Sequence, residues 1–261
     1  MFSVIITTFN RDKFLKRAFN SVINQSEKPK EIIIINNGNF KYKSNDFIYN
    51  KSYKIKLIIV NNKKNLFPSK ARNLGAGIAK NKYVCFLDDD DKWELNYLKE
   101  AMNIIIKKKP DLILSKIFIG KKIFKDPTNL NLNGILIQNP GVTGSNIIIN
   151  KKTFFQLNGY NSNLEPSEDK SIVIEALIKK KKIIISKKKV FFSNQNQARL
   201  TTNNLKLSMG VKNFYKKYKH LMNLNQKIHM LNRINIYNLK LFRIIYLPYF
   251  IFIAILNKIF N

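Results

Sequence analysis

The chain has 261 residues, of which 45% are hydrophobic and 12% aromatic, and this composition excludes a disordered protein. Its length allows one large domain, or one domain with an appendage. The formal net charge of +31 favours an anionic partner such as nucleic acid, anionic lipid or a phosphorylated substrate, although a bias toward lysine, asparagine and isoleucine along the whole chain explains the excess equally well. The single cysteine, Cys85, excludes an internal disulfide and fits a reducing compartment.

Strands and helices alternate along the first half of the chain. Four apolar runs predict strands, at residues 3–7 and in "EIIIINNG", "IKLIIV" and "KYVCFL". Apolar residues at helical spacing predict helices over roughly 11–24, 69–79 and 94–107. The last of these helices is expected to turn Leu95, Leu98, Met102, Ile105 and Ile106 inward. Asn10 is placed to cap the first of them. Because the strands are apolar on both faces, the pattern indicates an α/β fold, with a mostly parallel, Rossmann-like central sheet flanked by helices.

The alternation becomes irregular after about residue 111. Further strands are predicted in "LILSKIFI", "SNIII", "KKIII" and "VFF". A glycine-bearing turn is predicted in "NPGVTGSN", and a short helix over 168–180. Past Arg199 the composition changes, and residues 211–231 place apolar side chains on one helical face with lysines opposite. These changes predict a main domain over 1–205 and a basic, helical tail over 206–261.

The end of this tail is nearly all apolar. Ile244–Leu256 has Pro248 as its one interruption, and it is shorter than the roughly 20 apolar residues that a spanning helix needs. Basic residues flank it, which is typical of a segment that lies in the interface of an anionic membrane. The alternative is a helix that packs on the main domain, or on a second copy of the chain to form a homodimer.

Polar clusters follow three of the predicted strands, as "TTFN", "NNG" and the four aspartates 88–91. In parallel sheets ligands bind beyond the carboxyl ends of the strands, so these clusters are expected at one edge. Four adjacent carboxylates cannot all stay ionised and unpaired, and Mg²⁺ or Mn²⁺ would resolve this. Asp88 and Asp90, at i and i+2, form one candidate clamp. The alternative is a solvated turn with Asp90 or Asp91 capping the next helix.

Three further residues are candidates on chemical grounds. Arg72 lies in the first turns of a helix on the same edge, where it could bind phosphate, or it is one surface arginine among many basic residues. Glu168 and Asp169 open a helix, where a carboxylate could act as a general base or simply favour the helix dipole. The sequence has no Ser/His/Asp arrangement, no Cys/His metal spacing and no glycine-rich phosphate loop.

Seven motifs in register resemble the family 2 glycosyltransferases of GT-A fold. They cover about residues 2–200 and read, in order, "SVIITTFNR", "SVINQS", "EIIIINNG", "ARNLGAG", "FLDDDDKW", "TGSNIIINKKTFFQLNGYN" and "SED". The resemblance implies transfer of a sugar from a nucleotide-diphosphate donor with inversion, usually with Mg²⁺ or Mn²⁺. Two departures are visible: Asn36-Asn37 replaces a common Asp-Asp, and "LNGYN" replaces a more usual Gly-Gly-Phe-Asp.

The resemblance also implies residue roles. Nucleotide-sugar contacts are expected from Thr7, Phe9, Asn36, Asn37, Arg72, Asp88 and Asp89. The metal is expected on Asp90 with Asp88. The catalytic base is expected to be Asp169, paired with Glu168. Gly144, Ser145 and Trp93 are expected on the acceptor side, although a tryptophan at such a position is more often a core anchor.

These inferences predict a hexosyltransferase of bacterial surface polysaccharide synthesis, of the O-antigen type. Its donor would be a UDP-sugar, and its acceptor a lipooligosaccharide glycan or a polyprenyl-diphosphate-linked sugar. The protein is expected in the cytoplasm, peripheral on the inner face of the cell membrane, with no nucleic-acid partner. The alternative is a degenerate, non-catalytic binding protein of the same fold on anionic membrane or nucleic acid. A sugar-phosphate nucleotidyltransferase would need a glycine-rich first loop, which "ITTFNRDKF" lacks.

Overall fold

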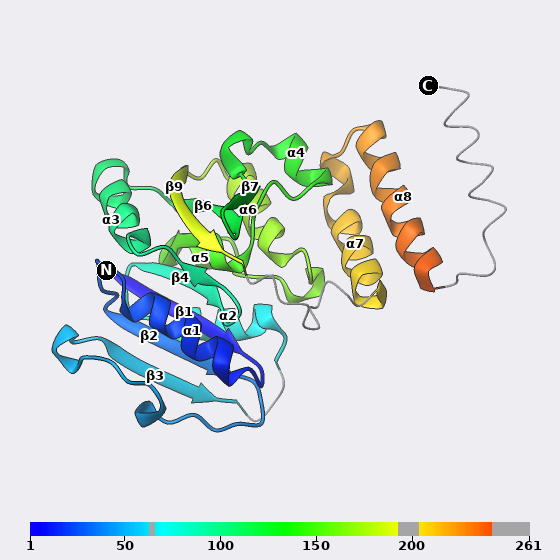
Figure 1. Ribbon diagram of the computed structural model, residues 1–261. Coiled ribbons are helices and arrows are strands. Elements are labelled where there is room, and N and C mark those ends of the chain that lie inside the picture. The colour runs from blue at the N-terminus through cyan, green and yellow to red at the C-terminus, as the bar shows by residue number, and fades with distance from the viewer. Residues whose placement is uncertain (63–65, 193–203, 242–261) are drawn as a thin grey trace. The chain divides into compact units, whose positions relative to one another are not determined.

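The computed structural model describes residues 1–62, 66–192 and 204–241 (Figure 1). The chain divides into two compact units, of which the first comprises residues 1–162 with 168–196 and the second residues 163–167 with 197–261. All the candidate site residues belong to the first unit. The domain boundary expected near residue 205 stays a prediction.

The first unit is built on one nine-stranded sheet with the order β3-β2-β1-β4-β8-β6-β9-β5, and β7 pairs with β6. The strands are β1 (Phe2–Thr8), β2 (Glu31–Asn36), β3 (Lys56–Asn61), β4 (Tyr83–Asp88), β5 (Lys92–Trp93), β6 (Leu112–Ile119), β7 (Lys122–Lys125), β8 (Ile147–Asn150) and β9 (Ile183–Phe191). β1 to β4 are mutually parallel, while β8 runs antiparallel to both of its neighbours, β4 and β6. The predicted α/β class with a mostly parallel sheet is confirmed.

The described helices lie around this sheet and in the second unit. In the first unit they are α1 (Asp12–Ile23), α2 (Pro68–Ile78), α3 (Tyr97–Lys108), α4 (Leu132–Ile137), α5 (Lys151–Gln156) and α6 (Glu168–Ile178). In the second unit they are α7 (Asn204–Tyr218) and α8 (Leu224–Leu241). A single 3₁₀ turn, η4 (Gly144–Asn146), leads directly into β8.

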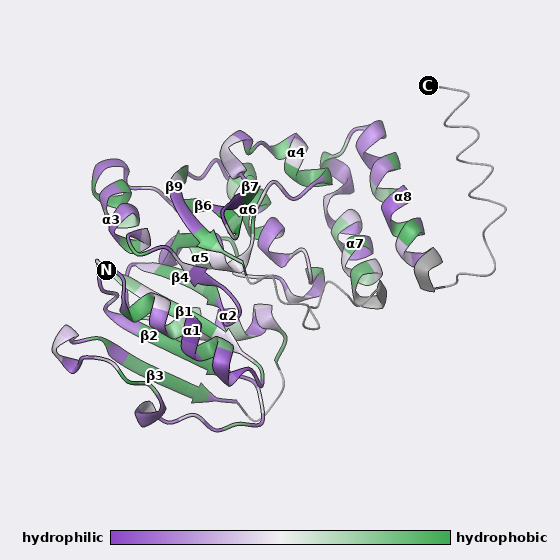
Figure 2. Cartoon of the chain, in the orientation of Figure 1, coloured by the Kyte–Doolittle hydropathy of each residue, from purple (hydrophilic) through white to green (hydrophobic). Residues whose placement is uncertain are grey.

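The central strands are largely apolar (Figure 2), and their isoleucine and valine residues are buried on both faces because helices cover both sides of them. Every residue of β1 and β2 is buried. The register pairs Thr7 of β1 with Asp88 of β4, and Thr8 with Asn36 of β2. The carboxyl ends of these three strands therefore lie side by side, and the polar residues that follow them gather at one edge of the sheet, as predicted.

Two segments differ from the prediction. "KKIII" and "VFF" are not separate strands but one continuous strand, β9, which spans the lysines between them. The helical face predicted over 211–231 is broken, since α7 ends at Tyr218 and α8 begins at Leu224. Asn223 and Gln226 exchange side-chain to backbone hydrogen bonds of 3.0 and 2.9 Å, a reciprocal cap that starts a new helix.

Two smaller expectations are also wrong. Asn10 does not cap α1, because its backbone has φ of 53° and its Oδ1 accepts a hydrogen bond from the Asn39 backbone at 2.7 Å instead. On the third helix Leu98 and Ile105 are buried as expected, but Ile106 is exposed. Leu95, expected on the same buried face, precedes the helix and is also exposed.

Among the described residues there is no helix with both the length and the apolar character needed to cross a membrane. The apolar segment Ile244–Leu256, predicted to lie at a membrane interface or to pack on protein, falls outside the described residues.

The close packing of α2 on the sheet gives a test of the fold. A Cβ on Gly75 would lie 2.5 Å from Cγ2 of Ile5, so Gly75→Ala should overpack the core and lower the free energy of unfolding by about 1–3 kcal/mol. Gly77, on the same helix, has no neighbour within 4 Å of such a Cβ. Gly77→Ala should therefore raise the free energy of unfolding by roughly 0.5–1 kcal/mol through helix propensity. Urea titration followed by circular dichroism measures both; equal effects of the two substitutions would contradict this packing.

Candidate active site

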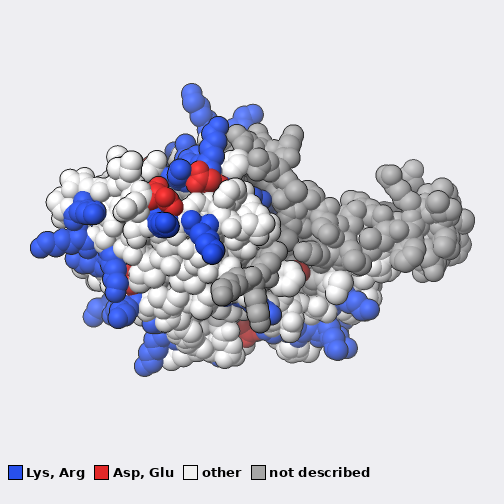
Figure 3. Space-filling view, turned by 90° about the horizontal axis from the view of Figure 1, so that it is seen from below, with Lys and Arg blue, Asp and Glu red and all other residues white. Residues whose placement is uncertain are grey.

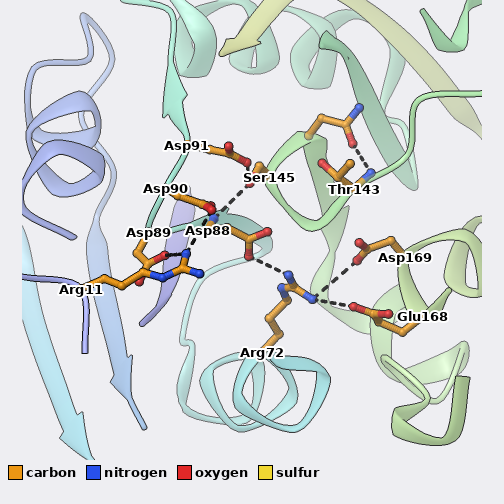
Figure 4. A network of polar contacts seen from close by, with 11 residues as sticks. Arg11, Arg72, Asp88, Asp89, Asp90, Asp91, Thr143, Ser145, Glu168 and Asp169 are labelled. Atoms are coloured by element: carbon orange, nitrogen blue, oxygen red, sulfur yellow. Dashed lines mark hydrogen bonds and ion pairs between the residues drawn. The ribbon is translucent and has the colours of Figure 1, made fainter. Parts of the chain in front are cut away.

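The first and last of the four aspartates are tied to other elements of the fold (Figure 4). Oδ1 of Asp88, the last residue of β4, accepts a hydrogen bond from Nη2 of Arg72 at 2.6 Å. Asp91 accepts one from the hydroxyl of Ser145 at 2.5 Å, and the same hydroxyl accepts the backbone N–H of Asp88 at 3.0 Å. Ser145 therefore fixes the two ends of the aspartate run relative to one another.

The two middle aspartates share an arginine of the first loop. Nη1 of Arg11 lies 3.2 Å from Asp89 and 3.0 Å from Asp90. The hydroxyl of Thr8 donates a second hydrogen bond to Asp89 at 2.7 Å. Burial raises the pKa of Asp89 to about 6, against the opposing effects of Thr8 and Arg11. Partners within the protein, of which Arg11 is shared by Asp89 and Asp90, thus offset part of the repulsion among the four carboxylates. Capping of the next helix is not their role, since α3 begins at Tyr97.

Arg72 connects the aspartates to the second acidic cluster. Its Nη1 lies 3.1 Å from Oε1 of Glu168 and 3.6 Å from Oδ1 of Asp169, while its Nη2 holds Asp88. Burial alone lowers the pKa of the guanidinium, but the three carboxylates outweigh this, and the pKa lies well above its ordinary value. Arg72 is a buried cation bound to three carboxylates, which excludes the alternative of a surface arginine.

Gly144 and Tyr160 lie beside this guanidinium, and the lack of a side chain at Gly144 leaves room for it. A Cβ on Gly144 would lie 2.7 Å from Nε and 2.8 Å from Cζ of Arg72, so only glycine fits in η4 at this point. The ring of Tyr160 lies 5.4 Å from the guanidinium carbon, at cation–π distance. Burial and the nearby Asp169 raise the pKa of Tyr160 well above its usual value, so the phenol remains neutral.

Ser145 and Trp93 lie inside the protein. Ser145 is fully buried, and its carbonyl accepts the indole N–H of Trp93 at 2.8 Å. The Trp93 ring stacks on Tyr97 with centroids 4.5 Å apart. The acceptor-side roles of Gly144, Ser145 and Trp93 stay predictions, and the contacts show that these residues also hold the aspartate loop and Arg72 in place.

Asn36 and Asn37, expected near the nucleobase, differ in their surroundings. The side chain of Asn36 is fully buried and bonds Oδ1 of Asn61 at 2.9 Å, the Phe40 carbonyl and the Gly38 N–H. Asn36 therefore organises the loop that follows β2. The amide oxygen of Asn37 lies 3.4 Å from Nδ2 of Asn62, at the limit of a hydrogen bond.

The remaining nucleotide candidates lie at the end of β1. Thr7 is nearly buried beside Asp88, whereas Phe9 is 47% exposed just beyond the strand. An exposed ring at this edge is available for contact with a ligand. Sequence reasoning missed Thr8 and Arg11 as partners of the aspartates, although both lie within the motif "SVIITTFNR"; their spacing carries no signal, because only the pairing of β1 with β4 brings them to Asp89.

The residues present fit a divalent cation only in part. Asp88 and Asp90 have side chains 29% and 26% exposed, which leaves carboxylate oxygen accessible at the sheet edge. Mg²⁺ typically takes one or two protein carboxylates and completes its shell with water and substrate phosphates. In the described ranges no group of three or more His, Cys, Asp and Glu side chains is arranged around a common metal position. The pair suits a metal that arrives with a phosphate ligand.

Comparison with known proteins agrees with this arrangement. The family model described as "Glycosyl transferase family 2" matches residues 3–160, which is more than half of the chain. The chain belongs to glycosyltransferase family 2. The matched region contains β1, α1, α2 and the four aspartates, and it ends at Tyr160, before Glu168 and Asp169.

Curated relatives of this glycosyltransferase are matched over part of their length. An uncharacterized glycosyltransferase of Rickettsia bellii is 39% identical over 97 residues, which is 37% of this chain and 14% of that protein. A cholesterol galactosyltransferase of Borreliella burgdorferi is 31% identical over 117 residues, 45% of this chain and 32% of that protein. The amylovoran biosynthesis glycosyltransferase AmsB of Erwinia amylovora is 29% identical over 106 residues, 40% of this chain and 35% of AmsB. The chain thus spans well under two thirds of the length of each of these relatives.

A solved structure shares the fold of this glycosyltransferase over nearly its whole length. Residues 1–349 of TarS from S. aureus, in complex with UDP-GlcNAc, superpose with a TM-score of 0.67 at 16% identity, covering 92% of this chain and 72% of that one. The identity is low, and the likeness shows the GT-A fold alone.

The fit of Arg72 against Gly144 can be tested with a double-mutant cycle. Gly144→Ala should displace the guanidinium, and Arg72→Lys should lose its two-sided contacts; each should lower the free energy of unfolding by roughly 1–4 kcal/mol. Because a flexible lysine tolerates the added methyl, the double variant should cost at least 0.5 kcal/mol less than the two singles together. Urea unfolding gives all four values. If the losses in unfolding free energy of the two single variants simply added up to that of the double variant, the two residues would not interact.

Proposed function

We propose that this protein is an inverting glycosyltransferase that moves a hexose from a nucleotide-diphosphate sugar to a hydroxyl group of a glycan acceptor. The observation that carries the proposal is the position of Asp169. Its carboxylate and that of Asp88 lie on either side of one guanidinium, at 3.6 and 2.6 Å from its nitrogens. A base on one side and the donor-side aspartates on the other is the arrangement needed for direct displacement.

Asp169 is the proposed general base. Its side chain is 17% exposed against 7% for Glu168, so it is the more accessible of the two carboxylates. Arg72 holds it in place through the ion pair, and a carboxylate in its ionised form can accept a proton from an attacking hydroxyl. Glu168 is proposed to share the Arg72 charge and to orient the guanidinium.

The donor is proposed to bind at the carboxyl ends of β1, β2 and β4, with Thr7, Phe9 and Asn37 nearest the nucleoside. Asp88 and Asp89 are proposed on the sugar-diphosphate side, and Mg²⁺ or Mn²⁺ would be held by Asp88 and Asp90. When bound, such a cation offsets the negative charge of the diphosphate leaving group. Arg72 and Asn36 act indirectly in this proposal, because both Nη atoms of Arg72 and the amide group of Asn36 are bonded within the protein. A UDP-sugar is the preferred donor, since the structural neighbour TarS was solved with UDP-GlcNAc.

The acceptor is proposed to be a lipid-linked glycan of bacterial surface polysaccharide synthesis, such as a lipooligosaccharide or a polyprenyl-diphosphate-linked sugar. The relative AmsB is named for amylovoran biosynthesis, which supports a polysaccharide role. The high positive charge suits a phosphate-bearing acceptor and a peripheral place on the inner face of the cell membrane.

Metal dependence tests the donor side of the site. Transfer should be lost in EDTA and restored by Mn²⁺ or Mg²⁺, whereas Asp90→Ala should lose transfer in a way that added metal does not restore. Asp12→Ala, which removes a surface carboxylate paired with Lys16, is the matched control and should keep activity. Product formation from a panel of radiolabelled nucleotide sugars provides the assay. Full transfer in EDTA would remove the cation from the proposal.

Loss of the base tests the mechanism. Asp169→Asn keeps the shape of the side chain, removes its basicity, and should lower kcat by about 10²–10⁴-fold with donor affinity nearly unchanged. Glu175→Gln, on the same helix, is the control. Turnover is followed by product chromatography and donor affinity by calorimetry, and an α-linked donor should yield a β-linked product. Wild-type turnover in Asp169→Asn would move the role to Glu168, and a retained anomer would reject direct displacement.

A further inference from the structure

The edge of the sheet opposite to the proposed site is lined with lysine. Because β1 to β4, β6 and β9 begin at this edge and the antiparallel β8 ends there, the topology brings seven strand ends together. Six of these ends have a lysine within three residues: Lys30, Lys56, Lys82, Lys109, Lys152 and Lys182. Several have further lysines beside them in the sequence, such as Lys107, Lys108 and Lys181.

These lysines present their charge to solvent. All six are exposed, and within the described residues none of them forms an ion pair. Of the carboxylates near this edge, Glu31 is buried and accepts bonds from Ser3 and the Lys80 N–H, Asp111 accepts bonds from Thr153 and the Lys182 N–H, and Glu27 is partly exposed. Basic side chains line the left margin of Figure 3, the side where β1 to β3 begin in Figure 1, and others lie elsewhere on the face shown.

Apolar side chains are interspersed among these charges. Tyr53, Ile106, Phe155 and Ile178 are 44%, 64%, 48% and 41% exposed, and each precedes or closely neighbours a lysine at this edge. Lys28 lies over the Tyr53 ring at 4.3 Å, so the ring and the charge occupy one spot. Exposed aromatic and aliphatic groups beside lysines are typical of surfaces that contact the headgroup region of a bilayer.

A shallow depression of about 550 Å³ lies in the middle of this edge, where β4 begins and β8 ends. It is lined by four lysines, two asparagines and one phenylalanine, with no carboxylate among them: Lys80, Asn81, Lys82, Asn150, Lys151, Lys152 and Phe155. Its size and charge suit a phosphate-bearing headgroup.

We propose that this amino-terminal edge, which we call the lysine edge, is the surface by which the protein contacts an anionic lipid bilayer. Its charge is carried by lysine, and none of the described arginines of the first unit, Arg11, Arg17 and Arg72, lies there. Base-specific recognition of nucleic acid uses the planar fork of arginine and base stacking, whereas a bilayer attracts dispersed point charges over a wide, flat area. The seven strands extend over roughly 30 Å at about 4.8 Å per strand, which matches such a contact.

This inference deepens the proposed membrane location, but its test needs no enzymatic activity, so the two proposals can fail separately. The full-length protein is mixed with vesicles of phosphatidylcholine alone or of equal parts phosphatidylcholine and phosphatidylglycerol, and the bound fraction is measured by flotation. Binding is expected only to the anionic vesicles, and it should weaken with rising salt.

A charge-reversal variant locates the contact. Lys82→Glu, Lys152→Glu and Lys182→Glu in one protein should lower the partition coefficient by at least about 100-fold, from roughly five-fold for each lysine removed. Lys13→Glu, Lys121→Glu and Lys122→Glu, at exposed positions away from this edge, change the net charge equally and form the matched control. Equal losses in the two triple variants would show that only net charge matters and would overturn the proposal.

Phe155→Ser separates a bilayer from other polyanions. It leaves the charge unchanged and removes an apolar contact, so it should reduce vesicle binding several-fold while binding to a DNA or RNA duplex stays the same. Circular dichroism and thermal unfolding check that each variant is folded. Tighter binding of wild-type protein to the duplex than to anionic vesicles, or unchanged vesicle binding of Phe155→Ser, would also overturn the proposal.

Discussion

The buried guanidinium of Arg72 is the constraint around which the site is organised. A charge removed from water costs several kcal/mol unless it is paired and hydrogen-bonded, so the protein must supply carboxylates at fixed positions around it. Asp88 ends β4, Glu168 and Asp169 begin α6, and the glycine of η4 leaves the space. Four elements that are distant in sequence therefore come together at this one side chain: helix α2, strand β4, the turn before β8 and helix α6. The proposed base and the donor-side aspartates are thereby placed relative to one another by a residue that needs to touch neither substrate.

The parts of the fold that the sequence predicted are those where one physical signal dominates. The isoleucine-rich runs of β1 to β4 are buried on both faces, and α1 and α2 have a clear apolar period, so their existence and the parallel arrangement follow directly. The later elements are short or partly exposed. Lys187, Lys188 and Lys189 suggest a break, but β9 continues through them because its strand is only half covered. The insertion of β8 between β4 and β6 depends on tertiary packing, and no local pattern encodes it.

For the site, the sequence predicted where the polar residues lie but not which groups they contact. The sequence placed the polar clusters at the correct edge, since strand ends in a parallel sheet must coincide there. It could not tell which side chains point to a ligand and which are bonded within the protein. Asn36, Ser145 and Trp93 are at this edge but fully or nearly buried, with their polar atoms bonded to neighbouring loops. Arg11 was indistinguishable among 47 basic residues until the pairing of β1 with β4 placed it beside Asp89.

The length of the central strands sets the distance between the lysine edge and the proposed active site. A strand of six residues such as β2 measures about 20 Å, and this is the separation between the lysine edge and the end of the sheet that carries the aspartates. A bilayer held at one end would leave the reacting hydroxyl about that far above the headgroups. Of the two proposed acceptors, a sugar directly on a polyprenyl diphosphate would be too close to the membrane, whereas the outer end of a lipid-linked glycan already several sugars long would reach the site. Such an enzyme would act late in chain assembly, after other transferases have built the stem.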